Sequence, residues 1–180
     1  AHMLNQINSG STIAPASNET FETQTRITSS PNVSFNGCAF RYTDGDVIHT
    51  QGGDTTIIDC YFNFIDKTVA NLSSVMTTLR LMGDGNHVRN NTFLKTAASS
   101  TLNSGNGPIV EYNDLSDTGH LQSDGAMIHL MAEQQKNAKI RYNWVHDTIK
   151  YGIRFDGDGE GNNGYIHHNV GWNCEGGIMA

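Results

Sequence analysis

The stretch Val88-Arg89-Asn90-Asn91-Thr92-Phe93 returns further along the chain as Ile140-Arg141-Tyr142-Asn143-Trp144-Val145. In both stretches an apolar residue stands at each end and an asparagine stands at the fourth position. A motif that recurs along a chain indicates a repeated structural unit. With Asn or Cys in fourth place, the pattern has four further copies, the last of which ends on Gly171: Phe35–Phe40, Ile57–Phe62, Val110–Leu115 and Ile166–Gly171.

The six copies begin 22, 31, 22, 30 and 26 residues apart. A fixed motif at irregular intervals indicates turns of one shape that carry loops of different length. The apolar ends can point into a shared core, while the fourth residue lies where the chain bends. Turns stacked about 4.8 Å apart would place the asparagines above one another, so that their amides form a ladder. We therefore expect one column of residues at this bend: Cys38, Cys60, Asn91, Asn113, Asn143 and Asn169.

Two further repeats follow the motif. A polar pair recurs after the bend, as Asp117-Thr118, Asp147-Thr148 and Asn173-Cys174. Another strand is expected later in most turns, directly after a glycine, at Gly45–His49, Gly125–His129, Gly152–Asp156 and Gly177–Ala180.

These repeats resemble the right-handed parallel β-helix of the pectate-lyase-like superfamily. The likeness is carried by Arg89–Phe93, Arg141–Val145 and Ile166–Val170, and it extends over residues 30–180. It implies an all-β, single-stranded right-handed solenoid of about six turns. The same coil serves lyases, hydrolases, epimerases and viral adhesins, so the resemblance specifies function poorly.

The boundaries follow from where the repeat is present. Ala1-His2-Met3 resembles a remnant of cloning, residues 4–31 are expected to form a cap or an irregular first turn, and the β-helix runs over residues 32–180. Ala180 falls inside an expected strand with no polar cap after it. We therefore expect a missing segment or a partner to cover the open last turn.

Three stretches within the solenoid need a separate interpretation. Residues 66–78 and the Ser/Gly/Asn-rich residues 96–108 are expected to be loops. Ala126–Lys139 has helix propensity, but its first half matches Gly45–His49 and is predicted to be a strand. A short helix at Ala132–Lys136 would not disturb the fold.

Composition limits the function. The 180 residues carry 11 basic and 18 acidic side chains, for a net charge of −7, which argues against nucleic-acid or anionic-membrane partners. Three cysteines permit at most one internal disulfide, and we expect Cys38 and Cys60 to remain free thiols in adjacent turns. The expected partner is a polysaccharide, and the expected location is secreted or periplasmic.

One face of the later strand gathers residues that can do chemistry. Alternation along the strand predicts that Ile153 and Phe155 face the core. The same register predicts that six residues face outward: Val47, His49, Met127, His129, Arg154 and Asp156. A polysaccharide lyase needs a base for the proton next to a uronate carboxyl group and a cation that neutralises that group. His129 and Arg154 are candidates for these two roles.

Other functions use the same or neighbouring residues. Asp124 and Asp156 can serve as the carboxylate pair of a glycoside hydrolase, and His49, Trp144 and His167 are candidate substrate contacts. Asp156, Asp158 and Glu160 alternate as in a calcium loop, so Ca²⁺ is a possible cofactor, but His167 stands where an EF-hand has Glu. His167 and His168 point to opposite faces of a strand and do not form a metal pair.

The sequence thus predicts a carbohydrate-active β-helix that cleaves an extracellular polysaccharide by β-elimination. A glycoside hydrolase on the same fold and a non-catalytic carbohydrate-binding or adhesin fragment remain alternatives.

Overall fold

The computed structural model describes residues 26–27, 30–43, 47–65, 77–96, 100–119, 124–130, 135–156 and 161–179. Within these ranges every regular element is a β-strand, and all strand pairs are parallel. The chain is therefore an all-β parallel solenoid, as predicted. Most of the expected cap at residues 4–31, most of the expected loop at 66–78 and most of the short helix at Ala132–Lys136 lie outside the described residues. The last two residues of that expected loop, Thr77 and Thr78, already belong to a strand.

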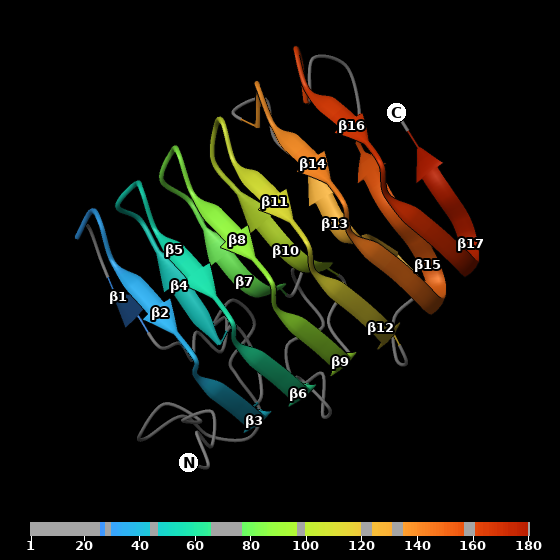
Figure 1. Ribbon diagram of the computed structural model, residues 1–180, viewed down its shortest axis with the longest axis horizontal. Helices are drawn as coiled ribbons and strands as arrows, with labels where there is room; N and C mark the ends of the chain where they lie inside the picture. Colours follow the sequence, from blue (N-terminus) through green and yellow to red (C-terminus); the bar gives the residue numbers. More distant parts are fainter. Residues whose placement is uncertain are drawn as a thin grey trace, which may run out of the picture.

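The first strand column is a six-stranded sheet that follows the six copies of the motif (Figure 1). Each strand pairs with its counterpart in the next turn at the same register, as for Ile57 with Val88 and Val88 with Val110. In chain order its strands are β2 (Ser34–Asn36), β5 (Thr56–Ile58), β8 (His87–Arg89), β11 (Ile109–Glu111), β14 (Lys139–Arg141) and β16 (Tyr165–His167).

The remaining strands form an eleven-stranded sheet, which supplies two further columns. The second column comprises β3 (Ala39–Thr43), β6 (Tyr61–Ile65), β9 (Thr92–Thr96) and β12 (Asp114–Thr118). The third comprises β1 (Arg26–Ile27), β4 (Ile48–Thr50), β7 (Thr77–Leu81), β10 (Ser100–Ser104) and β13 (Ala126–Leu130).

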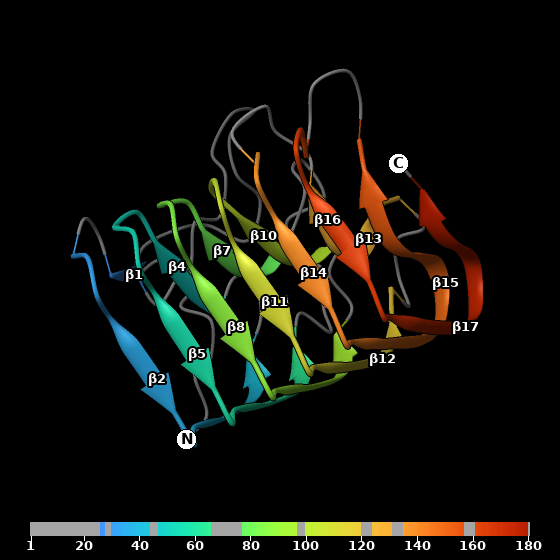
Figure 2. The same cartoon turned by 45° about the horizontal axis from the view of Figure 1, so that its top comes forward.

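Two long strands, β15 (Trp144–Phe155) and β17 (Val170–Met179), join the second and third columns. The first half of β15 pairs with β12 and its second half with β13, with a register shift against β17 between Thr148 and Tyr151. Figure 2 shows these strands bending at the corner between the two columns. Each turn therefore presents three outer faces, one for each column.

The corners between the columns use left-handed backbone, which turns the chain sharply from one column to the next. Most of these positions are Asp, Asn or Gly, which tolerate positive φ. Tyr112 and Tyr142 adopt it as well, with φ of 56° and 57°. The three stacked sets are Gly37, Asp59, Asn90, Tyr112, Tyr142 and His168; Tyr42, Phe64, Lys95, Asp117, Asp147 and Asn173; and Asn32, Asp54, Gly85, Gly107, Asn137 and Asn163.

The core is a set of stacked apolar rows that run along the solenoid. The ring of Phe62 lies between those of Phe40 and Phe93, with centroids 5.0 and 4.6 Å apart. Ile57, Val88 and the other first-column residues at this register pack from the opposite side. Fully burying one such side chain contributes about 2 kcal/mol, so the repeated apolar positions hold the turns together.

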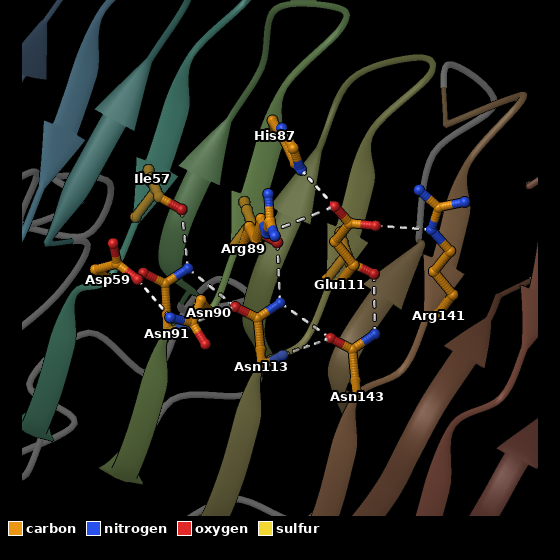
Figure 3. A network of polar contacts seen from close by, with 12 residues as sticks. Ile57, Asp59, His87, Arg89, Asn90, Asn91, Glu111, Asn113, Arg141 and Asn143 are labelled. Carbon is orange, nitrogen blue, oxygen red and sulfur yellow. Dashed lines mark hydrogen bonds and ion pairs between the residues drawn. The ribbon is translucent and has the colours of Figure 1, made fainter.

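The asparagine ladder forms as predicted, directly after the first column (Figure 3). The Nδ2 atom of Asn91 donates to Oδ1 of Asn113 at 2.9 Å, and Asn113 donates to Asn143 at the same distance. Asn143 continues the ladder to Asn169 at 3.0 Å, and the backbone N–H of Cys60 donates to Asn91 at 2.8 Å. A second ladder joins Thr118 to Thr148 after the next corner, through hydroxyls 3.0 Å apart.

The expectation for the cysteines is confirmed, since Cys38, Cys60 and Cys174 are free. Cys60 is buried and occupies the place that Asn91 has in the next turn. Burial raises the pKa of its thiol, which keeps the group neutral and unreactive.

Two sequence predictions about the third column are wrong. The proposed loop at 96–108 contains β10, whose five residues are all buried. Val47 and Met127, predicted to face outward, belong to the core together with their neighbours Ile48 and Ile128. Alternation therefore does not predict burial in this column, where successive residues of the chain are buried together.

Candidate active site

The third column presents a row of polar side chains on its outer face. The register aligns His49 of β4 with Arg80 of β7, and Arg80 with Asn103 of β10. Further along, His129 of β13 pairs with Arg154 of β15. The predicted neighbours His129 and Arg154 are thus confirmed as adjacent, and His49 lies on the same face nearer the N-terminal end.

Arg154 is the centre of a cluster of charged groups. Its Nη1 atom lies 2.9 Å from Oδ1 of Asp124, and its Nη2 atom lies 2.5 Å from Oδ1 of Asp156. The other Asp156 oxygen lies 3.3 Å from Nε2 of His129. On the far side of the imidazole ring, Nδ1 is 2.8 Å from the hydroxyl of Ser100. All four predicted catalytic residues therefore meet at one place.

Accessibility differs sharply across this cluster. The side chain of Asp124 is 72% exposed and that of Asp156 is 34% exposed, whereas that of His129 is only 3% exposed. His49 is buried as well. Both histidines, which the sequence predicted to face outward, are therefore covered from solvent. The groups that solvent reaches are the two carboxylates and part of Arg154.

The protonation states follow from these contacts. Burial lowers the pKa of His129, and the nearby Asp156 carboxylate opposes this only in part, so His129 is neutral at pH 7. The hydrogen bond from Arg154 lowers the pKa of Asp124, and the N–H of Gly125, 2.8 Å from Oδ1, lowers it further. Asp124 is therefore ionised.

Lys150 supports this cluster from within. It is 1% exposed, and its Nζ atom donates to the backbone oxygen of Asp124 at 2.6 Å. A buried ammonium group is costly unless it is hydrogen-bonded. The contact therefore fixes the backbone that presents Asp124 to Arg154.

The other predicted substrate contacts lie on different faces. Trp144 is 56% exposed on the second column, where its ring meets Trp172 edge-on at 6.1 Å. His167 lies on the first column, in line with Arg141. The structure therefore does not bring Trp144 or His167 to the Arg154 cluster.

The possible calcium site can be placed only in part. Asp156 ion-pairs with Arg154, while Asp158 and Glu160 lie outside the described residues. Among the described residues, no group of three or more His, Cys, Asp or Glu side chains is arranged to hold a metal ion.

Sequence reasoning missed Ser100, Arg80 and Lys150. Ser100 and Arg80 were overlooked because their strands lie in or next to stretches interpreted as loops. A signal was present, since Ile48-His49-Thr50, Leu79-Arg80-Leu81 and Leu102-Asn103-Ser104 each place an aliphatic and a polar residue shortly before a glycine. Those glycines stack so closely that a Cβ at Gly83 would lie 2.3 Å from the carbonyl carbon of Gly52.

Comparison with protein families assigns the fold. A family model described as "Right handed beta helix region" matches residues 17–180. The chain belongs to this right-handed β-helix family. No curated protein and no solved structure matches the chain. No helix in the described part of the β-helix is long and apolar enough to span a membrane.

The β-helix thus combines, on one outer face, an arginine shared by two carboxylates and a neutral histidine behind them. Such a group can neutralise a substrate carboxylate, accept a proton, or do both in one step.

Proposed function

We propose that this β-helix cleaves an acidic polysaccharide by β-elimination on the outer face of its third column. The observation that carries the proposal is the guanidinium of Arg154, which contacts the exposed Asp124 and the half-buried Asp156. Polysaccharide cleavage is a chemistry that the fold is compatible with, and the substrate class follows from the cation at the centre of the cluster.

Arg154 is suited to neutralise the carboxylate of a uronate sugar. Its contact with Asp124 involves a carboxylate that is largely exposed, and exposed ion pairs contribute at most about 1 kcal/mol. A substrate carboxylate can therefore replace Asp124 on Nη1 at small cost. Arg154 then stabilises the negative charge that develops on the substrate carboxyl group as the adjacent proton leaves.

Asp156 is the group placed to accept that proton. His129 was the first candidate for the base, but its burial prevents direct contact with a polymer, whereas Asp156 is accessible and lies 3.3 Å from it. The proton moves to an Asp156 oxygen, the electron pair of the broken C–H bond forms a carbon–carbon double bond, and the C–O bond to the leaving sugar breaks. The departing oxygen takes a proton from water, and Asp156 returns its own proton to solvent. Neutral His129 acts as a positioning residue that holds Asp156 in place.

Hydrolysis is the alternative because Asp124 and Asp156 form a carboxylate pair. A hydrolase needs one of its two carboxylic acids protonated. Arg154 keeps the pKa of Asp124 below its usual range, which opposes that protonation. The charge arrangement therefore favours elimination.

The first test is the absorbance of the unsaturated product during incubation with polygalacturonate, alginate and hyaluronate. Asp156→Asn should lower turnover about 10²-fold or more. Arg154→Lys, which keeps the charge but not the two-pronged geometry, should also lower it. The control is Arg41→Gln, which removes an exposed arginine from the second column. Equal turnover by all three variants, or binding of these polymers without cleavage, would refute the proposal.

Asp124→Asn separates elimination from hydrolysis. Elimination should persist in this variant because Arg154 is freed for the substrate, whereas a hydrolase that uses this carboxylate would lose activity in a reducing-sugar assay.

For His129→Gln, the acid limb of the pH–rate profile should change, because the lowered pKa of His129 sets the pH below which it becomes charged. An unchanged profile would remove His129 from the mechanism.

A further inference from the structure

The first column has an outer face with a different charge from the rest of the chain. Although the protein has a net charge of −7, Glu111 is the only acidic side chain on the outward positions of β8, β11, β14 and β16. Most of the other outward positions carry basic or aromatic side chains. We call these basic and aromatic side chains the basic face: His87, Arg89, Lys139, Arg141, Tyr165 and His167.

Glu111 organises the basic face from its centre (Figure 3). It is only 6% exposed. Its Oε2 atom lies 2.7 Å from Nε of Arg141, and its Oε1 atom lies 3.1 Å from Nε2 of His87 and 3.9 Å from Nε of Arg89. Burial alone would raise the pKa of Glu111, but the hydrogen bonds from Arg141 and His87 lower it. One buried carboxylate thus orients the cationic groups above it.

The arginines present their terminal nitrogens away from this contact. Both use Nε toward Glu111, and no Nη atom of Arg89 or Arg141 hydrogen-bonds to any described residue. The side chain of Arg89 is 51% exposed and lies over the Tyr112 ring, 5.6 Å from its centroid. Exposed Lys139 forms no ion pair within the described part of the chain. These groups retain the donors that bind carboxylate or sulfate oxygens.

The spacing of these groups suits a polymer rather than a single ion. Arg89, Glu111, Arg141 and His167 occupy the same register in four successive turns, so neighbours are about 4.8 Å apart along the solenoid. The two arginines are therefore about 10 Å apart. A chain that runs across the strands would meet one arginine and then the other, with Tyr165 exposed beside this row.

We propose that the basic face is a binding surface for an acidic polysaccharide, separate from the Arg154 cluster, with Arg89, Arg141 and Lys139 as its main contacts. The ligand is a chain of sugars that carry carboxylate or sulfate groups, laid along the solenoid axis. Exposed tyrosine rings next to the cations can pack against the C–H faces of sugars.

Nucleic acid fits this face less well. Duplex DNA carries one charge per about 1.7 Å, and the net negative charge of the whole protein opposes so dense a polyanion. A polysaccharide with one charge per sugar needs only the few spaced cations that the face provides.

The test measures binding to polygalacturonate, alginate and hyaluronate by calorimetry in an Asp156→Asn background, in which cleavage is slowed. Arg89→Gln/Lys139→Gln should weaken binding about tenfold, and added salt should weaken it further. These two side chains are exposed and make no hydrogen bond within the described residues, so the variant should fold normally. Arg41→Gln/Lys95→Gln removes the same charge from the second column and should leave the affinity unchanged.

Fully methyl-esterified polygalacturonate should not bind to this face, since its backbone is the same but its charge is removed. Equal loss of affinity in both double variants would assign the effect to net charge and overturn the proposal. Absence of binding to all three polymers would overturn it as well. Tighter binding of a DNA oligonucleotide that depends on Arg89 would replace polysaccharide by nucleic acid as the ligand. Retained binding without any turnover would refute only the catalytic proposal.

Discussion

Asn113 combines several contacts in one side chain. Its Nδ2 donates to Asn143 and to the backbone oxygen of Val88, while its Oδ1 accepts from the side chain and the backbone N–H of Asn91. An asparagine at this bend thus satisfies backbone groups that would otherwise be buried without partners. Because asparagine recurs at this position in four successive copies of the motif, the ladder was predictable from the sequence alone.

The burial of His129 and the role of Glu111 were not predictable in the same way. In the repeated motif Glu111 aligns with Arg89 and Arg141, but this alignment carries no measure of how deeply the side chain is buried. Burial of an outward side chain depends on which groups surround it in three dimensions. For Glu111 these are two arginines and a histidine from neighbouring turns, 22 to 30 residues away in the chain.

Glu111 should make the free energy of unfolding depend on pH in the acid range. Its folded pKa is lower than the ordinary value of 4.5, so the unfolded chain binds a proton before the folded protein does. Its contribution is therefore complete above that ordinary value and is lost as the pH falls through the folded pKa. Urea denaturation between about pH 3 and 7 should show a shallower loss of stability on acidification for Glu111→Gln than for the parent. Exposed Glu175→Gln is the control and should leave the slope unchanged, and a parental slope in Glu111→Gln would contradict the assignment.

At the scale of elements, the strands that carry the repeated motif were predictable from the sequence, whereas β10 was not. The first column was found because its apolar and asparagine positions repeat without insertions. Ser100–Ser104 was interpreted as a loop because its serines, threonine and asparagine have turn-like preferences. Pairing with both β7 and β13 overrides that local preference. The serines and the threonine are small enough to be buried in this strand.

Leu102 provides a test of β10 as a core strand. Its side chain is 2% exposed and pairs with Leu79 on one side and Ile128 on the other. Leu102→Ala should therefore lower the free energy of unfolding by about 3 kcal/mol, measured by urea denaturation. The matched change is Leu94→Ala in β9, where the leucine is partly exposed, and its cost should be clearly smaller. A loop in this position would give two equally small effects.

At the scale of the whole molecule, the solenoid distributes different chemistry over its three columns. The third carries the Arg154 cluster, the second carries Trp144 and Trp172, and the first carries the basic face. The outward side chains of a solenoid can differ from one face to the next, because the turns are held together by apolar rows that face the core. The candidate residues chosen from the sequence were consequently spread over three faces, and only the four around Arg154 converge.

The last prediction concerns the equivalence of the turns. Residues 92–113 form one complete turn, because Thr92 pairs with Asp114 and Asn91 contacts Asn113 at the same corner. Deleting these residues joins Asn91 to Asp114, so that β6 can pair with β12 and Asn91 with Asn143. Since each turn contacts mainly its neighbours, the shortened protein should keep a β-type circular dichroism spectrum and unfold cooperatively at a lower temperature.

Deleting residues 92–102 instead removes part of a turn and shifts every later strand out of register. This variant should lose the cooperative transition, because apolar rows would no longer meet their counterparts. If both deletions fold equally well, or if neither folds, stability in this protein does not come from interchangeable stacked turns. If only the full-turn deletion folds, the repeat read from the sequence is also the unit of stability.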